Sequence, residues 1–577
     1  MKKENRKVTS LSSENAQNNV TSYIDRNAQN FPDRVALRWV NIRDNSMFRG
    51  ELDTPFQHSE ITFSGFARNI GTVAAGLRDL GITKGARVII FLPMGLPMYT
   101  AIFAVLKLGA VAVFLDSWAR KKHLGASATC VNPTAMISHK QAFDLTATLS
   151  EFDEMRYRII AGSSTSEGYT ARFEDLTRGK RRATTAPVQP ESPALITFTT
   201  GSSGTPKGAN RTHRFLCAQH EALSEVLPYT ENDLDMPAFP IFSLNNLASA
   251  VTTILPAIDL AKPNELDSAA LTNQILNEKI TCVTFSPSML DGVAERCATD
   301  NLTLPDLRRV VTGGAPVSRI SVKSFMRIAP NAAVKIMYGA TEVEPMAHIE
   351  AKELLTLPLN PDPEIVENGV NVGHLNNKLN GKIICVVDGP IDLSTTDWNS
   401  LELPTGEIGE FIVSGEYVCR DYYNNPEAFR KSKIMDSDGN VWHRTGDLAR
   451  FDESGYLWIV GRIHNIIRRK NEYCFPVRAE LILNRLPWVR RGAFLELPGG
   501  KNDGSACVVV CIDMDQIDGR VAEDEIKRLF SKNAIPIDAF YIVDEIPMDP
   551  RHHSKVEYDV LRKRILKPEG SNYEPLQ

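Results

Sequence analysis

Short apolar runs alternate with helix-like segments through the first part of the chain. Residues 87–92 are largely apolar up to Pro93, and residues 134–138 repeat the pattern, so both predict buried strands. Residues 194–198 form a third such run, directly before a glycine-rich stretch. Buried strands that are separated by helices are typical of parallel sheets covered on both faces. The pattern therefore predicts an α/β fold.

The longest apolar stretch runs from Met98 to Asp116 and has the length of a membrane span. Lys107 and Gly109 interrupt it. We therefore expect a helix over 98–108 and a buried strand over 110–115, and no membrane span.

Length and composition bound the possibilities further. A chain of 577 residues is too long for one hydrophobic core, so two or more domains are expected. Its 65 basic and 70 acidic residues give a net charge of −5, which provides no basic surface for nucleic acid. The nine cysteines are scattered, and the amino-terminal residues are polar without a signal-peptide core, so a cytoplasmic protein with reduced thiols is expected. Cys507 and Cys511 lie in an apolar run that predicts a core strand.

Residues 197–208 (Thr-Phe-Thr-Thr-Gly-Ser-Ser-Gly-Thr-Pro-Lys-Gly) combine three glycines, six hydroxyl side chains and one lysine. Glycines let main-chain N–H groups approach an anion, hydroxyls donate to phosphate oxygens, and Lys207 adds a positive charge. The segment is neither a Walker A loop nor a dinucleotide fingerprint, because Pro206 precedes the lysine and Gly208 follows it. A flexible Gly/Ser linker is the alternative, but the strand-like run that leads into the segment favours a polyphosphate-binding loop.

Further motifs follow in a fixed order: Gly313-Gly314-Ala315-Pro316, Met337-Tyr338-Gly339-Ala340-Thr341-Glu342, His443-Arg444-Thr445-Gly446-Asp447, Gly461-Arg462, and Lys555 near the carboxyl end. Together with the phosphate loop, this set resembles the superfamily of AMP-forming adenylating enzymes, which includes acyl-CoA synthetases, luciferases and peptide-synthetase adenylation domains. The resemblance extends from about residue 20 to about residue 565.

The resemblance implies a division of the chain. After a polar tail over 1–19, residues 20–461 would form a large amino-terminal domain of mainly parallel α/β-layered sheets. A β-rich subdomain would lie at about 400–460, where residues 406–413 begin a pattern of short alternating strands. Residues 462–577 would form a small, mobile α+β lid.

The resemblance also implies the site. ATP would be bound by residues that fall into three groups, the phosphate loop, the adenine-binding segments and the ribose contacts: Thr200, Gly201, Ser202, Ser203, Gly204 and Lys207; Gly313, Gly314, Ala315, Pro316, Tyr338, Gly339, Ala340 and Thr341; Asp447 and Arg462. Glu342 would hold Mg²⁺, since this ion prefers few carboxylates together with substrate phosphates. Lys555 would be catalytic together with Thr200, Thr341 and Glu342.

The family's reaction is activation of a carboxylic acid as acyl-AMP with release of pyrophosphate, followed by acyl transfer, so a fatty acyl-CoA ligase is the first expectation. ATP and Mg²⁺ are the implied cofactors. A hydrophobic acid is expected because Phe239, Ile241, Phe242, Leu244 and Leu247 are apolar. The partner is a small-molecule acid, pathway enzymes stay open as further partners, and neither nucleic acid nor a membrane span is expected.

The segment that follows Gly461-Arg462 leaves CoA open. Residues 463–465 (Ile-His-Asn) replace the usual charged residues, and residues 469–477 contain no glycine where the pantetheine arm of CoA passes in relatives. These features resemble the β-lactone synthetases of olefin biosynthesis, in which the hydroxyl of a β-hydroxy fatty acid closes onto its own adenylated carboxylate without CoA. A third alternative is a non-catalytic nucleotide-binding homologue.

Overall fold

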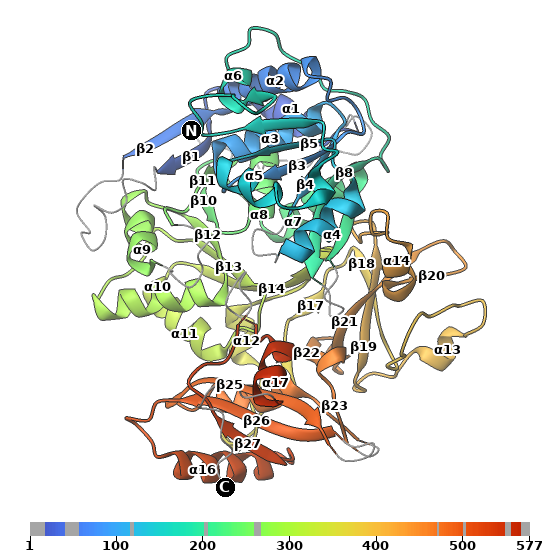
Figure 1. Cartoon of the computed structure of the whole chain (residues 1–577). Coiled ribbons are helices and arrows are strands. Elements are labelled where there is room, and N and C mark those ends of the chain that lie inside the picture. Colours follow the sequence, from blue (N-terminus) through green and yellow to red (C-terminus); the bar gives the residue numbers. More distant parts are fainter. Residues whose placement is uncertain are drawn as a thin grey trace. The chain divides into compact units, whose positions relative to one another are not determined.

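The structure is a computed structural model, and it describes residues 18–40, 57–115, 121–200, 206–258, 267–469, 472–499, 504–548 and 555–566 (Figure 1). The chain divides into two compact units. The first comprises Met1–Gly314, Ile320–Met346 and Ser414–His443, and the second comprises Ala315–Arg319, Ala347–Val413 and Arg444–Gln577. The boundaries predicted at 19/20 and 461/462 stay predictions.

The first unit contains a seven-stranded sheet in the order β7-β6-β5-β3-β4-β8-β9. Its strands are β3 (Arg87–Phe91), β4 (Val111–Phe114), β5 (Ala135–Ser138), β6 (Tyr157–Ile160), β7 (Ala171–Arg172), β8 (Pro193–Thr200) and β9 (Pro206–Thr212). All neighbours are parallel except β8 and β9, which form an antiparallel pair. The strands predicted at 87–92, 110–115, 134–138 and 194–198 are therefore confirmed.

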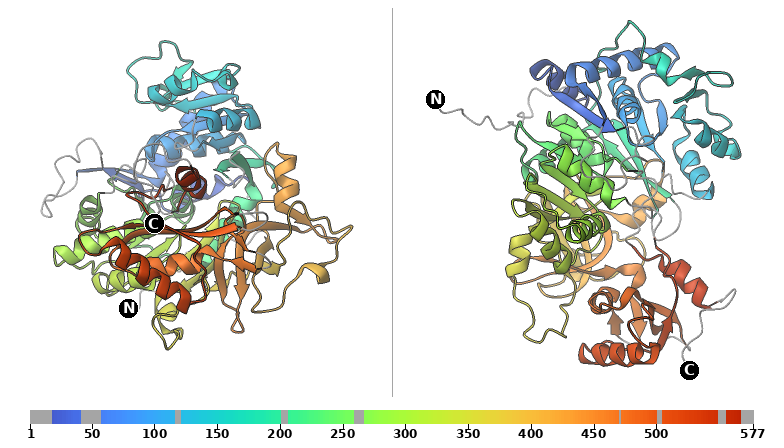
Figure 2. Two further views of the ribbon diagram at one scale, coloured as in Figure 1. Left: turned by 60° about the horizontal axis from the view of Figure 1, so that its bottom comes forward. Right: turned by 90° about the vertical axis from the view of Figure 1, so that its left-hand side faces the viewer.

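Helices accompany this sheet between successive strands: α2 (Phe63–Asp79), α3 (Leu96–Lys107), α4 (Lys121–Val131), α5 (Lys140–Thr146), the short 3₁₀ turn at Ser150–Phe152, α6 (Phe173–Leu176) and α7 (His213–Val226). Helix α3 packs on β3 and β4 and against α2, and Figure 2 shows these blue helices from two further sides. The predicted helix over 98–108 is thus α3, followed by a strand. Within the described residues, no helix has the length and apolarity needed to cross a bilayer.

A second sheet of the first unit runs β15-β14-β13-β12-β10-β11-β1-β2. Its strands are β1 (Val35–Val40), β2 (His58–Thr62), β10 (Leu234–Pro237), β11 (Thr252–Ile254), β12 (Cys282–Phe285), β13 (Arg309–Gly313), β14 (Ala333–Ala340) and the first half of β15 (Val343–Glu350). Along the path β1-β11-β10-β12-β13-β14, each strand is parallel to the next. The associated helices are α1 (Ser22–Asn30), α8 (Pro240–Ala248), α9 (Ser268–Asn277), α10 (Pro287–Thr299) and α11 (Arg319–Ile328). Because parallel strands end at one edge, the carboxyl ends of β13 and β14 lie together.

The second unit opens with β17 (His374–Leu375), which pairs with the second half of β15. Another sheet runs in the order β16-β22-β21-β19-β18, in which β22 is antiparallel to both β16 and β21; its strands are β16 (Val370–Asn371), β18 (Leu379–Ile384), β19 (Gly409–Gly415), β21 (Val441–Phe451) and β22 (Leu457–Arg462). The short helices α12 (Ala351–Thr356) and α13 (Trp398–Leu401) connect these strands. Helix α14 (Pro426–Ser432) and strand β20 (Lys433–Met435) lie in the chain between β19 and β21 and belong to the first unit.

The carboxyl-terminal part of the second unit begins with a 3₁₀ turn (Ile463–Asn465) and the hairpin β23 (Ile467–Arg469) and β24 (Glu472–Cys474). A three-stranded sheet of β25 (Val489–Pro498), β26 (Gly504–Ile512) and β27 (Ala539–Ile542) follows, with α15 (Pro476–Leu483), α16 (Gly519–Lys532) and α17 (Tyr558–Leu566).

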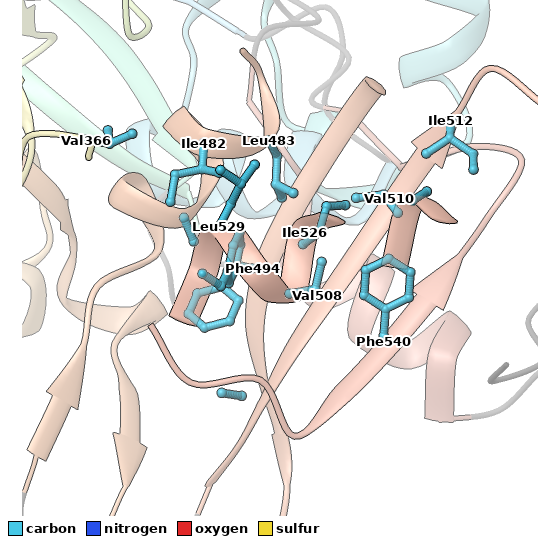
Figure 3. Packing of buried hydrophobic residues seen from close by; sticks show 14 of the residues in the cluster. Val366, Ile482, Leu483, Phe494, Val508, Val510, Ile512, Ile526, Leu529 and Phe540 are labelled. Carbon is cyan, nitrogen blue, oxygen red and sulfur yellow. The ribbon is translucent and has the colours of Figure 1, made fainter. Parts of the chain in front are cut away.

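Strand β26 has two buried faces. Val508, Val510 and Ile512 pack with residues of α15 and α16, together with Val366 from the loop before β16 (Figure 3). Cys507 and Cys511 point to the other face, where α17 packs. This alternation follows from the two-residue period of a strand, and it confirms that both cysteines are core residues. The mixed α/β architecture with parallel sheets confirms the predicted fold class.

Candidate active site

The predicted phosphate loop joins the antiparallel strands β8 and β9. Thr200 is the last residue of β8 and pairs with Pro206, the first residue of β9. Gly201, Ser202, Ser203 and Gly204 lie outside the described residues, as does the side chain of Thr200. The loop is therefore bounded on both sides by strands of the seven-stranded sheet.

Lys207 lies at the start of β9 beside two residues that come much later in the chain. Its Nζ atom lies 3.5 Å from the Ser432 hydroxyl, to which it donates, and 5.7 Å from the centre of the Tyr422 ring. Burial lowers the pKa of Lys207, and the charge of Glu342 opposes this effect. The lysine expected to meet phosphate thus lies next to a cluster of polar residues that includes Tyr422, Ser432 and Glu342.

The carboxyl edge of β13 and β14 requires glycine. A Cβ atom on Gly313 would come within 2.1 Å of the Met337 carbonyl oxygen, so a side chain at this position would collide with the neighbouring strand. Gly314 follows with a φ of +83°, a conformation that favours glycine. Tyr338 comes one residue after Met337 on β14. The two glycines therefore leave bare main chain next to an aromatic residue, which suits a flat ring.

The turn between β14 and β15 holds Thr341 and Glu342. The Thr341 carbonyl oxygen accepts hydrogen bonds from Arg211 Nε at 3.1 Å and Arg211 Nη2 at 2.7 Å. Behind the turn, a Cβ atom on Gly339 would lie 3.0 Å from the Glu344 side chain, so this position is also tight. The turn is thus fixed by a buried arginine from β9.

Glu342 is buried, with 8% of its surface exposed, and accepts a 2.8 Å hydrogen bond from the Tyr422 hydroxyl on Oε1. The main chain adds a second link, because the Cys419 N–H donates to the Glu342 carbonyl oxygen at 2.7 Å. Lys433 is almost completely buried, donates to the Cys419 carbonyl oxygen, and places its Nζ 5.3 Å from the Tyr422 ring centre. The Glu342 carboxylate therefore lies beside residues of the segment from Cys419 to Lys433.

The charges of this cluster can be assigned. Burial acts to raise the pKa of Glu342, but the pKa lies below its usual range, because positive charge at His443 (where that ring is protonated) and at Lys433, together with the Tyr422 hydrogen bond, outweighs burial. Burial, and then Lys433, lowers the pKa of His443 to about 3. His443 is therefore neutral near pH 7 and adds no positive charge there, so the cation that favours ionised Glu342 is Lys433; burial lowers the pKa of Lys433, and the Glu342 charge opposes that shift.

Glu344, two residues further along β15, behaves in the opposite way. Burial raises its pKa to about 7, although Arg211 opposes the shift. Its main-chain carbonyl accepts from Gln219 at 3.0 Å. One short segment thus carries an ionised carboxylate and a second carboxyl that is partly protonated at neutral pH.

A hydrophobic wall adjoins the same strand ends. Phe239, Ile241 and Phe242 pack with Val311 of β13 and Met337 of β14. Leu247 is buried on α8, and Leu244 is half-buried on the same helix. Three of the apolar residues predicted for an acyl site, Phe239, Ile241 and Phe242, therefore pack from α8 and its N-cap against the strands that carry Gly313 and Tyr338.

Glu342 suits Mg²⁺ in one respect. It is ionised, and the described part of the chain holds no group of three or more His, Cys, Asp or Glu side chains arranged for a metal ion. Magnesium bound there would need oxygen ligands from substrate phosphates and water, which is its usual preference.

The remaining predicted residues belong to the second unit. Asp447 is buried on β21 and forms an ion pair with Arg462, with 2.8 Å between Oδ1 and Nε. Arg462 also donates to the Thr445 carbonyl oxygen at 3.2 Å. Ala315 and Pro316 directly follow Gly314, and Lys555 is exposed just before α17.

The structure thus brings together Lys207, Thr341 and Glu342 in one cluster, and Asp447 with Arg462 in another. Sequence reasoning missed Tyr422, Lys433 and Arg211, which complete the first cluster. Tyr422 and Lys433 lie about 80 to 90 residues after Glu342 in the chain. His443 was visible only as the first residue of the His-Arg-Thr-Gly-Asp motif.

The chain resembles known proteins over almost its whole length. Residues 24–423 match the family model described as AMP-binding enzyme. Olefin beta-lactone synthetases of Stenotrophomonas maltophilia and Xanthomonas campestris pv. campestris are 27% and 29% identical, over 93% of this chain and 96% of each relative. The 4-coumarate–CoA ligase 3 of Oryza sativa subsp. japonica is 26% identical, with 85% of each chain covered. The crystal structure of ATP-bound MatB from Rhodopseudomonas palustris shares the fold, with a TM-score of 0.75, 19% identity and coverage of 96% and 100%.

Proposed function

Because the chain belongs to the AMP-binding enzyme family and is an AMP-forming ligase or synthetase, we propose that it activates a hydrophobic carboxylic acid with ATP. In this reaction a carboxylate oxygen attacks the α-phosphorus, the bond to the β-phosphate breaks, and acyl-AMP and pyrophosphate form. The observation that carries the proposal is the buried, ionised Glu342 beside Lys207, at the carboxyl edge of β14.

The reaction brings two anions together, so the protein must chiefly neutralise charge and align groups. Lys207 and the donors of residues 200–204 would bind the β- and γ-phosphates. Thr341 would contact the α-phosphate, and its position is fixed by the two Arg211 hydrogen bonds. Mg²⁺ bound through Glu342 would supply further charge neutralisation on the phosphate oxygens. Lys555 would stabilise the charge that develops between the carboxylate and the α-phosphate.

The nucleoside would be recognised by the remaining predicted residues. Gly313 and Gly314 leave bare main chain for the adenine, and Tyr338 supplies an aromatic face. Asp447 offers two acceptor oxygens, which suits a pair of ribose hydroxyls. The wall of Phe239, Ile241 and Phe242 supports an acid with a long apolar chain.

For the second step we propose intramolecular closure. The hydroxyl oxygen of a β-hydroxy acid would attack its own acyl carbon, AMP would leave, and the hydroxyl proton would pass to solvent. Similarity to two olefin beta-lactone synthetases over 93% of the chain supports this product. The absence of glycine from residues 469–477 also favours it over transfer to CoA. Transfer to CoA is the second candidate, supported by the similarity to 4-coumarate–CoA ligase 3.

The test is pyrophosphate release with ATP, Mg²⁺ and acids of increasing chain length, with and without a β-hydroxyl group. We expect release that depends on the acid, and a β-lactone from the β-hydroxy acids without CoA. An acyl-CoA product formed only when CoA is added would favour the second candidate. No release with any acid would overturn the proposal and leave the non-catalytic homologue.

The matched variants are Lys207→Met and Lys140→Met. Lys207 belongs to the predicted phosphate loop, whereas Lys140 is exposed on α5 and pairs only with its own helix neighbour Asp144 among the contacts that the described residues show. We expect Lys207→Met to reduce kcat/KM for ATP about 100-fold, the scale for loss of one charge-stabilising group. Lys140→Met should be unchanged. Equal activity of both variants would place the triphosphate elsewhere.

A further inference from the structure

Lys555 directly precedes an isolated strand bridge and the start of helix α17. Val556, the next residue, forms an antiparallel bridge with Met548. The Glu557 N–H donates to the Pro547 carbonyl oxygen at 2.8 Å. Helix α17 then begins at Tyr558. The main chain just after Lys555 is therefore attached to the segment that follows β27.

The first side chain of α17 makes a part-buried polar contact. The Tyr558 hydroxyl donates a hydrogen bond to Glu480 Oε1 on α15. The groups that face the Glu480 carboxylate are this hydroxyl and the main chain of Phe494 on β25. Burial raises the pKa of Glu480 to about 7 and that of Tyr558 well above its ordinary value. Neither group can exchange its partner for water without cost, so the bond fixes one geometry.

The rest of α17 is held mainly by apolar contacts. Leu561 and Ile565 are buried among residues of β25 and β26, with Val543 and Ile546. One turn after Tyr558, Arg562 Nε donates to the Glu496 carbonyl oxygen at 2.9 Å. Apolar packing alone allows small rotations and slides of a helix, whereas the part-buried hydrogen bond at its first residue restricts them. The main-chain contacts of Val556 and Glu557 lie closer to Lys555 in the chain, and the Tyr558–Glu480 bond is the side-chain hydrogen bond that fixes the start of α17 itself.

We propose that Tyr558 and Glu480 are a positioning pair that sets the place of Lys555 for the adenylation step. This inference rests on the role of Lys555 in the proposed function. Tyr558 follows Lys555 by three positions, a main-chain reach of roughly 10 Å at most between the two residues. A shift of about 1 Å in a catalytic group can cost about 100-fold in rate. Displacement of the start of α17 would therefore also displace Lys555.

The primary experiment compares Tyr558→Phe with Tyr541→Phe. Tyr541 lies on β27, packs against the same apolar cluster as Tyr558, and no contact of its hydroxyl is seen in the described structure, so it is the matched control. For Tyr558→Phe we expect adenylation kcat to fall about 10-fold to 100-fold, with KM for ATP changed less than about twofold. Consumption of pre-formed acyl-AMP should be unchanged, because it does not use Lys555. Tyr541→Phe should leave both steps unchanged.

Glu480 provides a rescue test that is independent of helix stability. Glu480→Gln keeps an oxygen that accepts from Tyr558, so adenylation should stay within about threefold of the unmodified protein. Glu480→Leu removes the acceptor and should repeat the Tyr558→Phe defect. A general loss of folding would reduce both half-reactions together, and that outcome would overturn the positioning role.

A double-mutant cycle separates this inference from the proposed function. If Lys555→Ala abolishes adenylation, then adding Tyr558→Phe should cause no further loss, because the residue being positioned is gone. Additive losses would overturn the inference and leave the function of Lys555 intact. If Lys555→Ala leaves adenylation unchanged, the proposed role of the lysine fails first.

Discussion

Glu342 and Glu480 are two of the carboxylates that accept a hydrogen bond from a tyrosine within the described residues, and their pKa values are shifted in opposite directions. Glu342 in the first unit pairs with Tyr422, and its pKa lies below the usual range. Glu480 in the second unit pairs with Tyr558, and burial raises its pKa to about 7. The chemical groups are the same, so the tyrosine does not decide the charge state.

The difference lies in the neighbouring cations. Lys433 contributes a buried positive charge near Glu342, whereas no cation contributes to the pKa of Glu480. Burial by itself favours the neutral acid, and a nearby opposite charge reverses this preference. One site therefore keeps a permanent anion, which suits a cation or a phosphate complex. The other is closer to a neutral hydrogen-bonding pair, which suits a structural role.

The largest expected effect comes from Lys433→Met, which would make the Glu342 site resemble the Glu480 site. Loss of the cation should raise the pKa of Glu342 and lower adenylation kcat/KM about 100-fold near pH 7. The defect should shrink as pH rises, because a higher pH ionises Glu342 again. The measurement is pyrophosphate release from pH 6 to pH 9.

Lys323→Met is the control for this variant, since Lys323 is an exposed lysine on α11. It should show the rate and pH profile of the unmodified protein. A Lys433→Met enzyme with an unchanged pH profile would show that Lys433 does not control the charge of Glu342.

Local structure was predictable because it depends on nearby residues. The strand expected over 87–92 is β3 at Arg87–Phe91, and the helix expected over 98–108 is α3 at Leu96–Lys107. The spacing of apolar residues indicates which face of a helix or strand is buried, even when the element that packs against this face is unknown. The sequence also placed Lys207 and Glu342 in recognisable motifs.

The partners of those motifs were not predictable in this way. Lys433 lies in a polar segment (Arg-Lys-Ser-Lys) in which a lysine normally faces solvent, and Glu480 has the spacing of an ordinary helix glutamate. Tyr422 meets Glu342 across 80 residues of sequence. Such contacts depend on how strands and loops assemble, and a single sequence carries no pattern for them.

The next prediction concerns stability around Glu480. In the folded protein the pKa of Glu480 is about 7, above the unfolded value of 4.5. Between pH 4.5 and pH 7, the Glu480 carboxyl is therefore protonated in the folded state but ionised in the unfolded state. Stability should therefore decrease as pH rises from about 4.5 to 7, by up to about 3 kcal/mol. Glu480→Gln should remove this slope.

The measurement is native-state hydrogen exchange of slowly exchanging amides in β26, corrected for the intrinsic dependence of exchange on pH. Amides in β14, near Glu342, serve as the internal reference and should show no such change in the variant. A slope in β26 that survives in Glu480→Gln would assign the titration to another group.

The smallest effect is the difference between two identical substitutions, Tyr422→Phe and Tyr558→Phe. A hydrogen bond to a charged group contributes about 1.5–3 kcal/mol to stability, and one between neutral groups about 0.5–1.5 kcal/mol. At pH 6, Glu342 is ionised while Glu480 is largely protonated, so Tyr422→Phe should destabilise its surroundings by about 1 kcal/mol more. At pH 8 Glu480 is ionised as well, and the difference should narrow. Hydrogen exchange in β14 and β26 at both pH values measures it, and equal losses at pH 6 would show that the two carboxylates share one charge state.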